Sequence, residues 1–184
     1  MIKYLLLGLL IAPSLALAQP YDVIKDQSVI GFSGTHTGKE FKGEFEDYTA
    51  EIDYDTDKPD SASAIVTMDV RGAKTGNAMY DGTLPSADWF DAGQYPQAVF
   101  ELTSMEKITE TTFKATGDLT IRDVTKPILF EFTLQGNNPL IMTADVPVNR
   151  LDYNIGTASD EKAEWVSKII MIHIKLAVMP RKDV

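Results

Sequence analysis

Apolar and polar residues alternate along nearly all of the chain after residue 20, which is the pattern of β-strands with one buried face. In residues 112–121, for example, Phe113, Ala115 and Leu119 share one face, while Lys114 and Asp118 share the other. The alternation predicts eight strands, which cover residues 22–33, 41–55, 62–70, 98–105, 112–121, 127–135, 140–148 and 165–179. A shift of phase at residues 47–48 indicates a bulge in the second strand.

One segment interrupts this alternation. Residues 76–96 contain two short helical patterns and a turn that ends at Pro96. We expect Ser86 to cap the second helical piece, residues 87–91, since serine is a preferred residue before a first helical turn. Because the segment carries several aromatic residues, we expect it to cover one end of an apolar interior.

Eight amphipathic strands without a long helix to cover them favour closure into a barrel. The predicted fold is all-β: an extended, eight-stranded antiparallel barrel with a short helical insertion between strands three and four. An outer-membrane barrel shows the same period with its apolar side outward. The dense charge on the polar faces, as at Lys42, Glu44 and Glu46, and the polar residues 180–184 argue against that alternative.

The first 18 residues have the features of a secretory signal peptide: Lys3, an apolar run over residues 5–11 and the small-residue site Ala16-Leu17-Ala18. The apolar run is too short to span a bilayer. We therefore expect a signal peptide over residues 1–18 and one domain over residues 19–184. The chain contains no cysteine, which excludes disulfides and a lipoprotein anchor and fits a soluble protein of a bacterial periplasm.

Charge and composition limit the partners and the chemistry. The formal net charge of −10 argues against nucleic acid and anionic membrane surfaces and favours a monomer or homodimer. The two histidines, His36 and His173, lack the spacing of metal ligands. The acidic residues 53–60 depart from a calcium loop, because Lys58 and Ala64 stand where that loop needs Gly and Glu.

Catalytic motifs are also missing from the sequence. No serine has the setting of a nucleophile elbow, and no Gly-rich loop opens a helix. Asp88 and Asp91 beside Trp89 could be paired carboxylates at a cleft, but helix-end capping is the simpler interpretation. We expect no enzyme activity, no metal and no cofactor.

Three segments resemble the YceI-like family: residues 81–100 (DGTLPSADWFDAGQYPQAVF), residues 117–127 (GDLTIRDVTKP) and, more weakly, the turn over residues 35–45. The chain departs from the family pattern at Trp89, at Asp123 and over residues 150–156. The resemblance implies an exported, lipocalin-like barrel that carries a polyisoprenoid, an isoprenoid quinone or another lipid, with its polar head near the mouth. It also implies a possible membrane partner of the cytochrome b561 type.

The interior residues proposed to contact such a ligand are mostly aromatic residues on apolar faces. They are Phe32, Phe45, Met68, Trp89, Phe90, Phe100, Leu119, Phe130, Phe132 and Ile172. Glycines such as Gly43 and Gly117 leave room on these faces, although strand bends explain them equally well. The alternative is a ligandless interaction module with a packed core, acting in an envelope stress response or on a redox partner. The sequence leaves the choice between a filled and a hollow barrel open.

Overall fold

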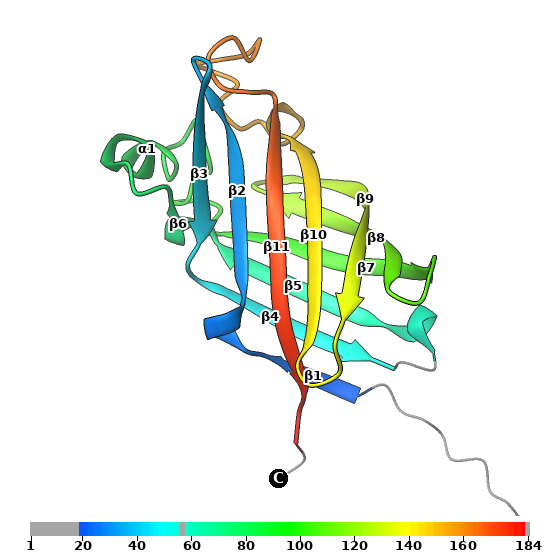
Figure 1. Ribbon diagram of the computed structural model, residues 1–184. Coiled ribbons are helices and arrows are strands. Elements are labelled where there is room, and N and C mark those ends of the chain that lie inside the picture. Colours follow the sequence, from blue (N-terminus) through cyan, green and yellow to red (C-terminus); the bar gives the residue numbers. More distant parts are fainter. Residues whose placement is uncertain (1–18, 56–57, 183–184) are drawn as a thin grey trace, which may run out of the picture.

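The computed structural model describes residues 19–55 and 58–182 of the chain (Figure 1). The expected signal peptide, residues 1–18, lies outside the described residues. The described part contains strands β1 (Gln19–Val23), β2 (Val29–His36), β3 (Lys39–Phe45), β4 (Tyr48–Tyr54), β5 (Ser63–Asp69), β6 (Ala73–Lys74), β7 (Gln97–Lys107), β8 (Thr112–Ile121), β9 (Val124–Gln135), β10 (Leu140–Asn149) and β11 (Ile169–Pro180). Its helices are η1 (Lys25–Gln27), η2 (Pro59–Ser61), η3 (Val70–Gly72), α1 (Ala78–Thr83) and η4 (Arg150–Tyr153).

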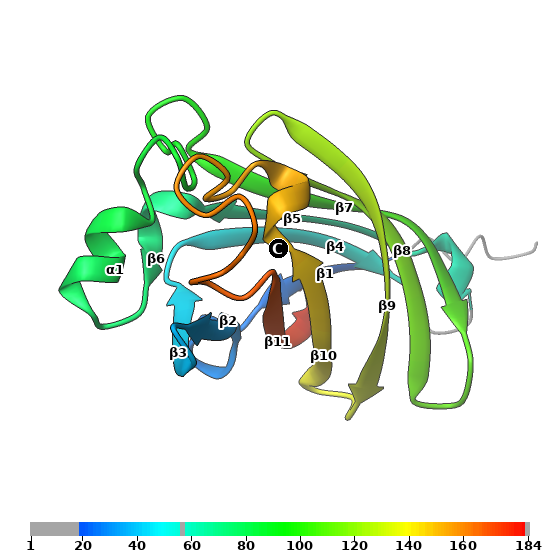
Figure 2. The ribbon, with the colours of Figure 1, turned by 90° about the horizontal axis from the view of Figure 1, so that it is seen from above.

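The strands form a closed antiparallel barrel, which confirms the predicted fold. The eight strands of the ring are, in order, β1, β4, β5, β7, β8, β9, β10 and β11, and β1 pairs with β11 to close it. Strands β10, β11, β2 and β3 cross in front of β4, β5 and β7 at a large angle (Figure 1), and the view from above shows the strands arranged around a ring (Figure 2). Closure leaves the ring without an exposed sheet edge along most of its circumference.

The first two predicted strands are each broken into two. Strands β1 and β2 both pair with β11 and are separated by η1. Strands β3 and β4 part at residues 46–47, so the chain has a strand break where a bulge was predicted at residues 47–48. The third predicted strand corresponds to β5 alone, and η3 and the short β6 follow it. The last strand begins at Ile169, so that Trp165 belongs to the preceding loop. The breaks bend the chain while each half keeps its apolar side chains inward.

The insertion between β6 and β7 is helical, as predicted, but it contains one helix. Asn77 caps α1: its Oδ1 accepts hydrogen bonds from the N–H groups of Met79 (3.0 Å) and Tyr80 (3.4 Å). The prediction that Ser86 caps a second helix is wrong, since residues 87–90 form turns. Asp91 adopts a left-handed conformation (φ 48°), which reverses the chain before a second helix can form.

A buried ion pair organises the loop between β10 and β11. Arg150 Nη2 lies 2.6 Å from Asp160 Oδ2. The Arg150 side chain is 2% exposed and the Asp160 side chain 4% exposed. The Asp160 carboxylate also accepts the N–H groups of Glu164 (2.8 Å) and Val166 (2.9 Å), and Arg150 donates to the carbonyl of Ile155 (2.7 Å). Every charge in the pair is therefore matched, which a buried ion pair requires.

Burial acts on both members of this pair. Burial by itself would raise the pKa of Asp160, but hydrogen bonds from the Val166, Trp165 and Glu164 N–H groups and the Arg150 guanidinium outweigh it, so the pKa lies below its usual range. Burial lowers the pKa of Arg150, and Asp160 opposes that change. An arginine remains protonated in this setting, so the pair is ionised.

The same loop is bonded to the insertion. The Asp88 carboxylate accepts hydrogen bonds from the Ala158 N–H (2.8 Å), the Ser159 N–H (3.0 Å) and the Ser159 hydroxyl (2.6 Å). The Gly156 N–H donates to the Asp88 carbonyl at 2.6 Å. Asp88 therefore binds N–H groups of a distant loop and not those of a helix end, so the helix-end capping expected from the sequence is wrong. Insertion and loop together cover one end of the barrel.

Two glycines allow phenylalanine rings to lie on the barrel wall. A Cβ placed on Gly117 would lie 2.4 Å from Cε2 of Phe100 and 2.5 Å from the carbonyl oxygen of Glu101. A Cβ on Gly43 would lie 2.3 Å from Cζ of Phe32. The rings rest directly on the neighbouring backbone, so they occupy less of the interior than upright rings would. Room on the apolar faces, rather than a strand bend alone, explains these two glycines.

We expect Asp160→Asn to lower the free energy of unfolding by roughly 3–5 kcal/mol, because it leaves the Arg150 charge buried without its partner. The control is Asp22→Asn, which breaks an exposed pair with Arg181 (2.8 Å) and should cost no more than ~1 kcal/mol. Urea unfolding measures both values, and equal losses would contradict a structural role for the buried pair.

The same variant should change the response to pH. Since the pKa of Asp160 is lower in the folded chain, its contribution is complete above about pH 4 and is lost as the pH falls through the folded value. Asp160→Asn should therefore be less sensitive to acid than the unsubstituted protein.

We expect Gly117→Ala to destabilise the protein by about 1–3 kcal/mol, because the added methyl group collides with Phe100 and with the Glu101 backbone. Gly93→Ala is the control, since a Cβ there meets no atom within 4 Å. Thermal unfolding measures both. A wild-type melting temperature for Gly117→Ala would mean that the close approach has no energetic weight.

Candidate functional site

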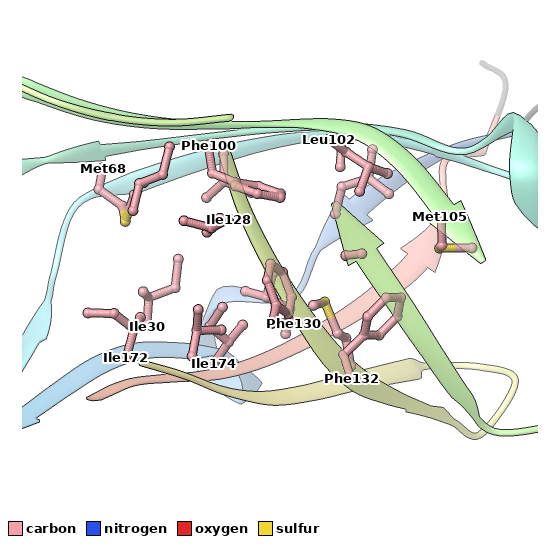
Figure 3. A pocket seen from close by; sticks show the side chains of 18 of the residues that line it. Ile30, Met68, Phe100, Leu102, Met105, Ile128, Phe130, Phe132, Ile172 and Ile174 are labelled. Carbon is pink, nitrogen blue, oxygen red and sulfur yellow. The ribbon is translucent and has the colours of Figure 1, made fainter. Parts of the chain in front are cut away.

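The interior of the barrel is hollow. Its cavity has a volume of about 180 Å³, whereas a single buried water needs only ~10–15 Å³. Side chains from both crossing layers surround it: Met68, Phe100 and Leu102 lie on one side, and Ile30, Ile172 and Ile174 lie on the other (Figure 3). The choice between a filled and a hollow barrel, which the sequence leaves open, is therefore settled in favour of a hollow one.

Aromatic rings line much of the cavity. Phe130 lies 5.6 Å from Phe100 and 6.4 Å from Phe132, measured between ring centroids. These three rings come from β7 and β9 and project into the space (Figure 3). Apolar walls of this kind can exclude water from a hydrocarbon chain but supply few hydrogen bonds to hold it in one position.

Eight of the ten residues predicted to face a ligand line this cavity. They are Phe45, Met68, Phe90, Phe100, Leu119, Phe130, Phe132 and Ile172. Phe32 is buried behind Phe45, at a ring distance of 5.3 Å. The Trp89 ring centroid lies 5.6 Å from the guanidinium carbon of Arg150. Trp89 also borders a separate cavity of about 140 Å³ beside His36 and Tyr80. Both residues therefore support the covered end of the barrel instead of the main cavity.

Sequence reasoning missed other residues of the wall. Ile30, Met105 and Met142 line the cavity, as do Leu102, Ile128 and Ile174. The signal was present, because Leu102, Ile128 and Ile174 lie on predicted apolar faces. A preference for aromatic residues passed over these aliphatic ones.

The two ends of the cavity differ in polarity. The rings of Phe45 and Phe90, 6.1 Å apart, close the end beneath the insertion. Among the described lining residues, those with polar side-chain atoms all belong to the opposite end, formed by β1, β4 and β5: they are Tyr21, Asp53, Tyr54 and Ser63. Burial, followed by the nearby Tyr21 and Asp55, raises the pKa of Tyr54, which keeps this hydroxyl protonated.

One pair of neighbouring strands separates along most of its length. Strands β9 and β10 are paired at three positions, of which Thr143 and Thr133 are the last, whereas β10 and β11 are paired at ten. The Thr133 and Thr143 hydroxyls are 2.7 Å apart, and beyond them the two strands separate (Figures 1 and 2). We call this point the β9–β10 fork.

A hydrogen-bonded Ser–His–Asp chain lies on the outer face of the barrel. Ser33 Oγ is 2.7 Å from His173 Nε2, and His173 Nδ1 is 2.6 Å from Asp145 Oδ1. This is the order of groups in a serine hydrolase. However, Ser33 pairs with both β11 and β3, so the ladders use the N–H groups that an oxyanion hole would need. These hydrogen bonds link the adjacent strands β2, β11 and β10.

The described residues also lack a cluster of metal ligands and a membrane-spanning helix. Within residues 19–55 and 58–182, no three His, Cys, Asp or Glu residues gather closely enough to hold a metal ion. His36 instead contacts the Tyr80 hydroxyl through Nδ1, at 2.8 Å. None of the described helices has the length and hydropathy of a membrane span.

Several solved structures have this fold. The crystal structure of Burkholderia cenocepacia BcnA matches with a TM-score of 0.82 at 26% identity, covering 86% of this chain and all of the other. The Campylobacter jejuni YceI protein matches with a TM-score of 0.69 at 27% identity, covering 78% and 86% of the two chains. A polyisoprenoid-binding domain of Saccharophagus degradans, at 13% identity and a TM-score of 0.70, shares the fold over 89% of this chain and 99% of that one.

Sequence relatives agree with the structural ones. A UPF0312 protein of Photorhabdus laumondii is 35% identical over 144 residues, which is 74% of each chain. One of Pseudomonas putida is 31% identical over 130 residues, covering 69% of this chain and 68% of that protein. The YceI-like domain profile matches residues 21–178, which cover all but the outermost residues of the barrel. The chain therefore belongs to the YceI-like family.

Proposed function

We propose that this protein is a periplasmic carrier, without enzyme activity, that holds a long apolar amphiphile inside the barrel. The ligand class is a polyisoprenoid, an isoprenoid quinone or another lipid. The single observation that carries this proposal is the apolar cavity of about 180 Å³ inside the closed barrel. Each Å² of hydrocarbon removed from water there contributes about 25 cal/mol to binding.

The shape of the wall supports a flexible chain as ligand. Met68, Met105 and Met142 line the cavity on three different strands. Methionine side chains adapt to irregular and changing surfaces, because they are unbranched and polarizable. The polyisoprenoid-binding description of the Saccharophagus degradans domain, which has the same fold, is consistent with this ligand class.

The competing proposal is an interaction module with a packed core. The open volume among Phe100, Phe130 and Ile172 gives that core no support. A periplasmic location follows from the expected signal peptide, and a cytochrome b561-type membrane partner and a monomeric or homodimeric state stay predictions. The proposed lack of enzyme activity stays a prediction; the strand pairing of Ser33 on both sides argues against an oxyanion hole beside the Ser33–His173–Asp145 hydrogen bonds.

We expect a lipid to remain bound when the exported protein is purified without detergent. Extraction with organic solvent followed by mass spectrometry should release a long apolar molecule in near-stoichiometric amount. An empty extract, together with no uptake of a fluorescent prenyl analogue by the purified protein, would contradict the proposed function.

We expect Leu119→Trp to block binding by filling the cavity, because Leu119 is 6% exposed and faces that space. The matched control is Leu129→Trp on the adjacent strand, where the leucine is 61% exposed. Geranylgeraniol at 100 times its Kd should stabilise the control by about 2.7 kcal/mol, or roughly 5–10 °C in melting temperature. Leu119→Trp should show no such increase, and an equal increase in both would place the ligand elsewhere.

A further inference from the structure

Beyond the β9–β10 fork, no ladder hydrogen bonds join β9 to β10. The outer edge of β9 pairs with β8 at ten positions, and β10 pairs with β11 at ten, so both strands are held firmly on their far sides. On the inner side of this seam, Phe130, Val146 and Val148 are buried and line the cavity. Beyond Thr133, side chains and no ladder hydrogen bonds therefore border the seam.

A groove lies on the outer surface at the fork. It has a volume of about 380 Å³, and its rim consists of Glu131, Thr133, Thr143, Asp145, His173 and Lys175. Phe132 and Ile174 border both this groove and the inner cavity. At this point the wall between groove and cavity is one residue thick.

The residue beside this thin part of the wall is small. Ala144 borders the groove and is 8% exposed. Continuing the register of Thr143 with Thr133 would place Ala144 opposite Phe132, where the paired ladder has just ended. A methyl group at this position leaves space that a larger side chain would fill.

The rim of the groove has a mixed charge and many hydrogen-bonding groups. Glu131 and Asp145 supply two carboxylates, and Lys175 supplies one ammonium group. Asp145 and Ser33 hold the His173 ring in place from its two nitrogens. An excess of negative charge disfavours a diphosphate, whereas the threonine hydroxyls and the ammonium group suit a hydroxyl, phenol or carbonyl head.

We propose that the groove at the β9–β10 fork binds the uncharged, hydrogen-bonding head of the ligand, and that the apolar chain passes between β9 and β10 into the cavity. This inference rests on the proposed carrier function. Parting β9 from β10 beyond Thr133 breaks no ladder hydrogen bonds, whereas parting β10 from β11 would break a ladder of ten pairs. The covered end is held by Asp88, which makes opening there costlier.

The head position can be tested because the chain contains no cysteine. Thr143→Cys in the groove and Ser63→Cys at the polar end of the cavity each give one site for a fluorophore; both residues are exposed. The probe is a geranylgeranyl chain with a nitroxide on its head, which quenches fluorescence over a short range. We expect strong quenching at position 143 and at least five-fold less at position 63.

The outcomes separate the two proposals. Stronger quenching at position 63 would overturn the groove as the head site and leave the carrier function standing. No quenching at either position, together with no increase in melting temperature on adding geranylgeraniol, would contradict the carrier function itself.

The route through the fork is tested by Ala144→Leu. We expect uptake of a fluorescent prenyl alcohol to slow at least ten-fold, because the larger side chain fills the opening. The control is Ala87→Leu, an exposed alanine of the insertion that lines neither the cavity nor the groove, and it should keep the wild-type rate. Equal rates in the two variants would overturn the lateral route, while ligand-induced stabilisation in both would keep the carrier function.

Discussion

The closed ring of main-chain hydrogen bonds is the constraint on which the rest of the structure depends. Because β1 pairs back onto β11, a main-chain ladder joins each neighbouring pair of strands in the ring, although the ladder between β9 and β10 ends at Thr133, and no filled interior is needed to connect them. In a packed globular core, an empty space of this size would forfeit many contacts. Here the ladders hold the wall in place, so apolar side chains can face one another across open space.

The cavity must also be kept from collapsing and from filling with water. At one end, the insertion between β6 and β7 and the loop between β10 and β11 cover it. The Arg150–Asp160 pair holds the loop between β10 and β11 in one conformation, and Asp88 fastens the insertion to that loop. Phe90 then projects from the insertion into the cavity beside Phe45. The ion pair and the Asp88 hydrogen bonds thus hold in place the segment that carries Phe90, and Phe90 closes this end of the cavity.

The sequence predicted most of the residues that line the cavity wall, but little of how the insertion and the loop between β10 and β11 cover one end. Alternation places Phe100, Leu119 and Phe130 inward because strand geometry allows only two faces. It fails for Phe32 and Trp89, because their surroundings depend on Phe45 and Arg150, which are distant in the chain. The β9–β10 fork was also beyond reach, since alternation gives the faces of a strand and not the length over which neighbours pair.

The ring contact between Phe45 and Phe90 closes one end of the cavity with hydrocarbon alone. A chain that enters elsewhere must stop there, and its last carbons meet aromatic carbon instead of water. For the proposed carrier, this closed end limits the length of hydrocarbon that fits: shorter chains would leave part of the wall uncovered, and longer ones would fold back or remain partly outside. Chain length, rather than any polar contact, is the property of a hydrocarbon that this closed end can discriminate.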